Sequence, residues 1–269
     1  MPGPIVAIGG AEFHMRPENE ALHDYIVSLL EPARPRICLV PTAGGDPHDQ
    51  IAAFHAAMER RGAEASSMSL FRLGDFPVDP GEHLLRQDAI YVTGGSMVNL
   101  MALWREHGID RLMREAHDRG ILLCGYSAGS MCWFESGISR GGGVPAPVAG
   151  IGLIPGSHCV HYSQDPDRRD AYRRAVAHGG IGPGLALDDH AAALIRDGEI
   201  VEAVRATETA SAFRVERGGE GDEARETPLE ARLLPAHGPG PEPALDEMRE
   251  LRRMRSERSS GPGRLGRRG

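Results

Sequence analysis

Short apolar segments alternate with amphipathic stretches through the first two thirds of the chain. The apolar segments predict β-strands at residues 5–8, 36–40, 65–70, 89–92 and 121–124. Apolar positions at helical spacing predict helices over residues 18–30, 47–61, 98–106 and 109–119. Asp46 is the predicted N-cap of the second of these helices. Strands that alternate with helices are typical of βαβ units, so the pattern predicts an α/β fold with a mainly parallel sheet.

The pattern changes after about residue 186. Short alternating segments at residues 191–196, 200–204 and 211–216, with a turn at Asp197-Gly198, predict an antiparallel extension of the sheet. From Gly218 the chain becomes polar, and residues 235–269 are rich in Pro, Gly, Ser and Arg. We therefore expect one α/β domain over residues 1–234 and a disordered tail over residues 235–269.

Composition excludes several classes of protein. Hydrophobic residues make up 41% of the chain and charged residues 25%, and no apolar segment approaches the ~20 residues that span a bilayer. The amino terminus lacks the basic segment of a secretion signal, so we expect a cytoplasmic protein with no membrane partner. The net charge of −8 argues against nucleic acid as a partner.

The basic and sulfur-containing side chains limit the chemistry further. All 30 basic residues are arginines, which removes a Schiff-base lysine or a Ser–Lys mechanism from consideration. The four cysteines are scattered without C-x-x-C spacing. Cys38 and Cys124 lie in apolar strand-like segments, so we expect these two to be reduced and buried rather than disulfide-bonded or zinc ligands.

Glycine-rich loops follow three of the predicted strands, at Gly9-Gly10, Gly44-Gly45 and Gly94-Gly95. In an open parallel sheet such loops gather at the carboxyl edge, where ligands bind. None of the loops spells a dinucleotide-binding or Walker A sequence. The loops therefore predict a ligand site without a nucleotide motif.

A Gly-x-Ser-x-Gly sequence at residues 125–129 lies between the apolar segment 121–124 and the helix-like stretch 131–136. A strand that breaks into a helix through this sequence is typical of a nucleophile elbow, in which the serine hydroxyl projects above the sheet. Ser127 is therefore the candidate nucleophile. The amides that follow it are candidate oxyanion donors.

A serine nucleophile needs a general base and a group that orients the base. Among the 12 histidines, His158 and His161 lie in a strand-like segment after the elbow, and the sequence does not rank them. Asp188 and Asp189 follow a later apolar strand and are candidate orienting acids. The resulting order of serine, histidine and acid departs from that of α/β hydrolases.

Four segments in this order carry a resemblance to a known family, at residues 91–100, 125–130, 152–162 and 186–189. They resemble the peptidase E (aspartyl dipeptidase) family of serine peptidases, which is related in fold to class I glutamine amidotransferases and includes cyanophycinase-like enzymes. The resemblance covers roughly residues 4–217. It implies a flavodoxin-like, three-layer α/β/α fold and a peptidase that needs neither metal nor cofactor.

The resemblance also implies roles for particular residues. Ser127 matches the nucleophile, His161 the base and Asp189 the acid, with the amides of Gly95 and Ala128 as the oxyanion hole. The dipeptidase carries a glutamate where this chain has Asp189, whose side chain is shorter. Asp188 and Glu135 therefore stay open as alternative acids.

The implied substrate is a short peptide, a dipeptide with an N-terminal aspartate, whose carboxylate a guanidinium would bind. Arg169 matches the family's substrate arginine, although Arg168 and Arg169 could equally cap a helix over residues 170–178. A cyanophycinase-like or isoaspartyl peptidase and a non-enzymatic small-molecule-binding protein are the alternative functions. The oligomeric state is left open, with a homodimer as one option.

Overall fold

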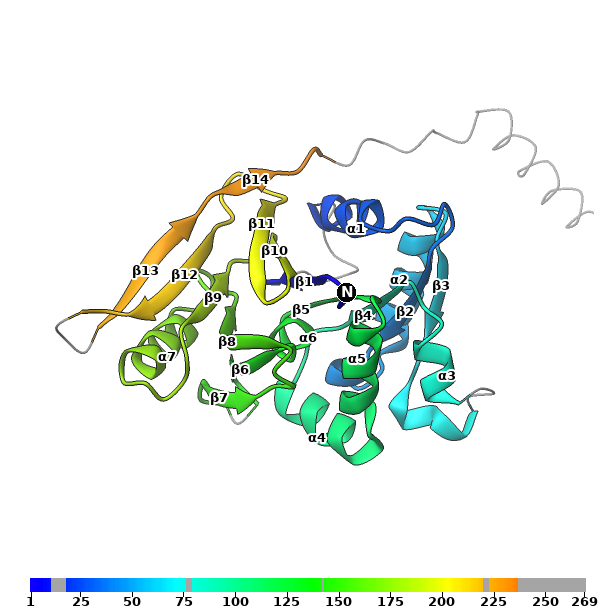
Figure 1. The fold of residues 1–269 in the computed structure, drawn as a ribbon, viewed down its shortest axis with the longest axis horizontal. Coiled ribbons are helices and arrows are strands. Elements are labelled where there is room, and N and C mark those ends of the chain that lie inside the picture. Colours follow the sequence, from blue (N-terminus) through cyan, green and yellow to red (C-terminus); the bar gives the residue numbers. More distant parts are fainter. Residues whose placement is uncertain (11–17, 76–78, 142, 220–222, 237–269) are drawn as a thin grey trace, which may run out of the picture. The chain divides into compact units, whose positions relative to one another are not determined.

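Two β-sheets form the framework of the chain (Figure 1). The computed structural model describes residues 1–10, 18–75, 79–141, 143–219 and 223–236. Within these ranges the main sheet has eight strands, in the spatial order β14 (Ala231–Leu233), β11 (Glu199–Arg205), β10 (Ala191–Arg196), β1 (Ile5–Ile8), β5 (Leu122–Tyr126), β4 (Ala89–Val92), β2 (Arg36–Val40) and β3 (Glu64–Ser67). The neighbours from β1 to β3 pair in parallel, whereas β10 and β11 form an antiparallel hairpin beside β1.

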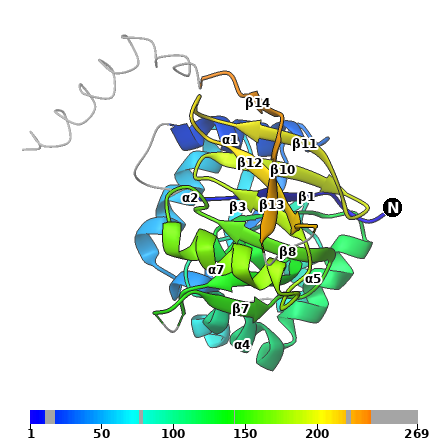
Figure 2. The ribbon, with the colours of Figure 1, turned by 90° about the vertical axis from the view of Figure 1, so that its left-hand side faces the viewer.

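The second sheet follows the elbow in the chain. Its six described strands have the order β13 (Ala224–Leu229), β12 (Ala212–Arg217), β9 (Gly184–Leu187), β8 (Ile154–Val160), β6 (Phe134–Ser139) and β7 (Ala146–Ala149). Strands β6, β8 and β9 pair in parallel, so their carboxyl ends lie at one edge. The helix α7 (Pro166–Ala177) covers one face of this sheet, as Figure 2 shows.

Helices cover both faces of the main sheet because its central strands are apolar on both sides. Along β1, Ile5 and Ala7 belong to one core cluster and Val6 and Ile8 to the other, as alternate residues of a strand must. The first cluster also contains residues of α3 (Pro80–Leu84), α4 (Met97–His107), α5 (Ile109–Asp118) and α6 (Ala128–Met131). The second contains residues of α1 (Glu18–Ser28) and α2 (His48–Glu59). Two short 3₁₀ helices, η1 (Thr42–Gly44) and η2 (Leu70–Asp75), follow β2 and β3.

The predicted α/β class with helices on both faces of a mainly parallel sheet is confirmed. Strands β1, β2, β4 and β10 have the predicted bounds. Residues Met1–Ala236 form one compact unit, and the predicted tail lies outside the described residues from residue 237 onward. None of the helices in the described ranges is long and apolar enough to cross a membrane.

The stretch after the elbow differs from the prediction of a helix over residues 131–136. Helix α6 ends at Met131, and β6 begins at Phe134. The carbonyl of Cys132 accepts from the amide of Ile151, and that of Trp133 accepts from Leu153 and Ile154. These carbonyls therefore accept hydrogen bonds from a segment distant in sequence rather than from the next turn of a helix.

Two further expectations are corrected. Strand β12 pairs with β9 of the second sheet and does not extend the main sheet. Asp46 is not the N-cap of α2, because Pro47 occupies that position. The Asp46 carboxylate instead accepts hydrogen bonds from the Ser69 hydroxyl and the amide of Phe71.

Candidate active site

Ser127 lies at the turn between β5 and α6, with φ 53° and ψ −117°. A positive φ is strained for a residue with a side chain, and such strain is typical of a nucleophile elbow. Hydrogen bonds on both sides hold the turn. The Ser127 amide donates to the carbonyl of Ile8 at 3.1 Å, and its carbonyl accepts from Ser130 and Met131 at 3.0 Å each.

His161 follows the last residue of β8 and also has a positive φ, of 51°. Its Nε2 atom lies 2.9 Å from the Ser127 hydroxyl oxygen. The amide of Asp165 donates to the His161 carbonyl, and the amide of Tyr162 donates to Leu187, so the segment is fixed against β9. Hydrogen bonds from Arg140 lower the pKa of Asp165 to about 2, which keeps this carboxylate ionised next to the histidine segment.

Asp189 follows β9 and is the third residue in the line of contacts that begins at Ser127 and continues through His161. Its carboxylate lies 2.5 Å from His161 Nδ1, and its amide donates to the side chain of Gln164. This bond fixes the tautomer, because Nδ1–H donates to the carboxylate and Nε2 is left as an acceptor for the serine hydroxyl. The side chains of His161 and Asp189 are 30% and 33% exposed, so a substrate can reach them.

Gly10, after β1, lies against this pair. A Cβ atom added there would lie 1.8 Å from the Asp189 carboxylate and 2.6 Å from the His161 ring. Only glycine fits at that distance. The Gly9-Gly10 loop in the sequence is the signal of this approach.

The two alternative acids have other partners. Asp188 is 1% exposed and accepts from the amides of Ser163 and Ser211. Glu135 accepts from the amide of Gly156 at 2.8 Å. Of the three candidate acids, Asp189 is the one whose carboxylate contacts His161.

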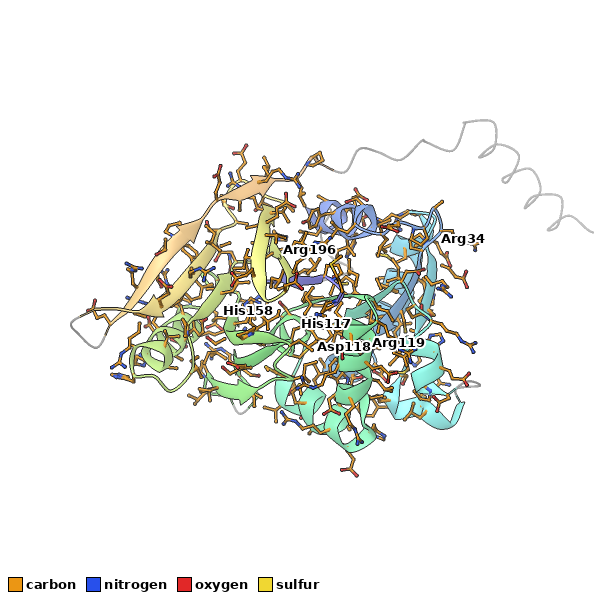
Figure 3. All side chains as sticks on the ribbon, in the orientation of Figure 1. Arg34, His117, Asp118, Arg119, His158 and Arg196 are labelled. Carbon is orange, nitrogen blue, oxygen red and sulfur yellow. The ribbon has the colours of Figure 1, made fainter. Side chains whose placement is uncertain are left out.

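His158, the other candidate base, is fully buried against the elbow turn (labelled in Figure 3). Its Nδ1 atom donates to the Leu185 carbonyl at 2.9 Å, and its Nε2 atom lies 2.8 Å from the Ser130 hydroxyl. The ring stacks on Phe134. Burial lowers the pKa of His158 to about 4, so the ring is neutral at pH 7 and can accept from Ser130. The hydrogen bond between Ser130 and His158 joins α6 to β8.

The buried His158 makes stability depend on pH. An unfolded histidine has a pKa of about 6.5, so as the pH falls the unfolded chain binds this proton before the folded chain does. The free energy of unfolding should therefore decrease between about pH 6.5 and pH 4, by on the order of 3 kcal/mol from this residue. Chemical denaturation at several pH values measures this. A His158→Gln variant with the same pH dependence as the original chain would contradict the assignment.

The predicted oxyanion donors border the same turn. Ala128 is the first residue of α6, where an amide has no carbonyl partner inside the helix. Gly95 has φ 141°, and a Cβ added there would lie 2.1 Å from the carbonyl oxygen of Ala43. The backbone at Gly95 therefore requires glycine. The loop is held by the Ser96 amide, which donates to Ala43 at 2.8 Å.

Arg169 lies on α7 and has a carboxylate partner within the chain. Its Nε and Nη2 atoms contact the two oxygens of Glu226 on β13, at 3.1 and 2.6 Å. Its guanidinium also lies over the ring of Tyr162, 5.0 Å from the ring centre. Arg173, one turn further along α7, contacts the same glutamate at 3.3 Å.

Comparisons with known proteins place the chain among the serine-type peptidases. The family model of Peptidase family S51 matches residues 5–203, and the chain belongs to this family. An uncharacterized peptidase of Bacillus subtilis (strain 168), YgaJ, is 36% identical over 211 residues, which cover 78% of this chain and 91% of the relative.

Two solved structures have a similar fold. A peptidase from an acI-B1 actinobacterium has a TM-score of 0.60 at 19% identity, covering 86% of this chain and 95% of that one. A candidate peptidase E protein from Listeria monocytogenes EGD-e has a TM-score of 0.56 at 18% identity, covering 76% and 99%. The resemblance to peptidase E that the four sequence segments carry is thereby confirmed at the level of the family.

Proposed function

We propose that this serine peptidase hydrolyses short peptides, and dipeptides with an N-terminal aspartate in particular, through Ser127, His161 and Asp189. The observation that carries the proposal is the continuous row of contacts from the Ser127 hydroxyl through both ring nitrogens of His161 to the Asp189 carboxylate. A serine becomes a strong nucleophile when a positioned base removes its proton.

The mechanism begins with attack of the Ser127 oxygen on the peptide carbonyl carbon while His161 Nε2 takes the hydroxyl proton. Asp189 stabilises the imidazolium that forms. The amides of Gly95 and Ala128 would donate to the oxygen of the tetrahedral intermediate, a contribution of about 3 kcal/mol for each donor. His161 then gives its proton to the leaving amine. Water repeats the sequence on the acyl-enzyme and releases the acid product.

A dipeptide panel tests the reaction and the substrate. The first residue is varied over aspartate, isoaspartate, asparagine, glutamate and alanine, and the chain is compared with Ser127→Ala. We expect fastest hydrolysis with aspartate first, and hydrolysis by the variant that is slower by at least roughly 10⁴-fold. Fastest hydrolysis of isoaspartyl peptides would support the cyanophycinase-like or isoaspartyl alternative, and undiminished hydrolysis by Ser127→Ala would place the catalyst elsewhere.

We further propose that Arg169 binds the carboxylate of the substrate's first residue, exchanging Glu226 for it. A guanidinium that holds one carboxylate with two atoms can hold another in the same way. Its position over Tyr162, the residue after His161, supports this role.

Replacement of Arg169 tests this role against a matched control. Arg169→Ala should lower kcat/KM for aspartyl dipeptides at least 10-fold more than for alanyl dipeptides, because a bound carboxylate loses its charged partner. Arg173→Ala removes another contact of Glu226 and should lower kcat/KM for both substrates equally. Equal losses in Arg169→Ala would remove its role in specificity.

A further inference from the structure

A cavity of about 440 Å³ lies at the carboxyl edge of the main sheet, between the loop after β2 and the helix α4 (elements in Figure 1). Its lining includes Thr42, Gly44, Phe71, Asn99, Ala102 and Leu103. No charged side chain lines it within the part of the chain that the structure describes. The cavity is large enough for the side chain of one leucine or phenylalanine.

Contacts link this cavity to Ser127 through the glycine loop. A Cβ added to Gly94 would lie 3.1 Å from the Ser127 Cβ, and one added to Gly44 would lie 3.4 Å from the Gly94 carbonyl oxygen. In the sheet, β4 lies between β5, which ends just before Ser127, and β2, which leads into the cavity wall. Two strand spacings of about 4.8 Å place the cavity roughly 10 Å from the nucleophile.

Two residues of the cavity lining, Phe71 and Thr42, have an unusual degree of exposure for their side chains. Phe71 is 60% exposed, although a solvent-facing aromatic side chain gains nothing from water. Thr42, by contrast, is 1% exposed, and within the described residues its hydroxyl has no hydrogen-bond partner. A ligand with an apolar group would cover Phe71 and Leu103.

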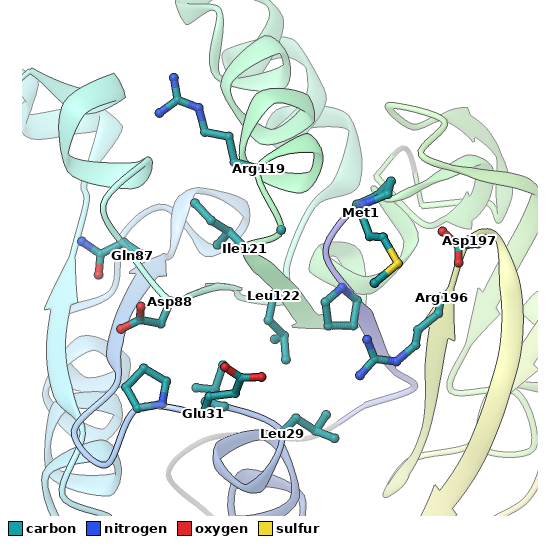
Figure 4. A pocket seen from close by; sticks show the side chains of 15 residues that line it. Met1, Leu29, Glu31, Gln87, Asp88, Arg119, Ile121, Leu122, Arg196 and Asp197 are labelled. Carbon is teal, nitrogen blue, oxygen red and sulfur yellow. The ribbon is translucent and has the colours of Figure 1, made fainter.

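A second cavity, of about 540 Å³, differs in both place and chemistry. It lies at the opposite, amino edge of the main sheet, where the carboxylate of Glu31 and the guanidinium of Arg196 point into it (Figure 4). None of the residues proposed for catalysis lines it. Of these two cavities, the apolar one beside the glycine loop lies at the same edge of the main sheet as Ser127.

The two sides of Ser127 are not equivalent. Asp189 and His161 lie on the side of β1, where Gly10 approaches them, whereas Gly95 and the cavity lie on the side of β4 and β2. In the proposed function, Arg169 on α7 binds the side chain of the residue before the scissile bond. The residue after the bond then extends across β4. One residue spans up to about 3.6 Å of backbone, and a large side chain adds enough length to reach a cavity about 10 Å away.

We propose that this cavity, defined by Phe71, Leu103 and Gly44, is the subsite for the leaving residue of the peptide and selects a large apolar side chain there. The inference rests on the proposed function. It names the substrate class as dipeptides with leucine, methionine or phenylalanine as the second residue.

Kinetics with a constant first residue test the subsite. The ratio of kcat/KM for a leucine or phenylalanine leaving residue to that for alanine should be about 10 or more. In the double variant Phe71→Ser/Leu103→Ser, this ratio of kcat/KM values should fall to near 1. The conservative substitution Phe71→Leu should retain most of the ratio. Val201→Ser, which alters a comparably exposed apolar residue on β11, should leave the ratio as it was. An unchanged ratio in the double variant would overturn the subsite.

A binding measurement separates this proposal from the function on which it rests. Ser127→Ala is titrated with the same dipeptides by calorimetry, with and without Phe71→Ser, after thermal unfolding has shown that each variant folds. Tighter binding of the apolar peptides that is lost with Phe71→Ser supports the subsite even where hydrolysis fails. Equal binding of all the peptides contradicts the subsite, whether or not the enzyme hydrolyses them.

Discussion

Ser127→Ala lowers kcat/KM for peptide hydrolysis by roughly 10⁴- to 10⁶-fold, the range expected when a serine nucleophile is removed. In the proposed mechanism, this substitution removes the oxygen that attacks the carbonyl, so no acyl-enzyme can form. The binding site and the oxyanion donors stay in place, so KM should change much less than kcat. Steady-state kinetics on the best dipeptide of the panel measure both parameters.

Ser130→Ala is the matched control for this prediction. Ser130 belongs to the same turn, and its hydroxyl contacts the buried His158 rather than His161. Loss of this hydroxyl should lower the free energy of unfolding by about 1–3 kcal/mol, because a buried hydrogen bond is removed. It should lower kcat less than 10-fold. A loss in Ser130→Ala as large as in Ser127→Ala would mean that the integrity of the turn, and not the Ser127 hydroxyl, carries the activity.

Asp189→Asn should lower kcat by about 10⁴-fold with little effect on stability. The amide of asparagine can donate to His161 Nδ1, which moves the ring proton to Nε2, and Nε2 can then no longer accept the serine proton. Circular dichroism and thermal unfolding check that the fold is retained. Kinetics at pH 7 check the loss.

Variants of the two other acids separate the three candidates. Asp188→Asn leaves one of the amides of Ser163 and Ser211 without its acceptor, so it should lower the free energy of unfolding by about 1–3 kcal/mol. Glu135→Gln keeps an acceptor for Gly156 and should keep kcat within a few fold. If Glu135→Gln loses activity and Asp189→Asn does not, the assignment of the acid is wrong.

The sequence predicts the main sheet well because its strands carry a strong local signal. Ile5–Ile8 and Ala89–Val92 are short, wholly buried apolar segments bounded by proline, glycine or polar residues, and tertiary contacts only strengthen that preference. Strands of the second sheet carry a weaker signal. Strand β13 has an exposed edge and includes Pro228, and nothing in Ala224–Leu229 alternates as a half-buried strand does.

At the candidate site, the motif predicts Ser127 as the nucleophile, but the residues that contact Ser127 depend on contacts distant in sequence. His158 and His161 belong to one segment, and they differ because His158 lies inside β8 and faces the core whereas His161 lies beyond the end of the strand. Asp188 and Asp189 are adjacent, and the chain's turn after β9 directs one toward Ser163 and the other toward His161. The pairing of Arg169 with Glu226 depends on β13, which the sequence did not predict.

Covalent trapping of the nucleophile tests the central claim most directly. The chain is treated with a fluorophosphonate, and the modified residue is located by mass spectrometry in the original protein and in His161→Gln. We predict one adduct, on Ser127, whose formation slows at least 100-fold in the histidine variant because the general base is missing. An adduct on another residue, or labelling of Ser127 at the same rate without His161, would contradict it.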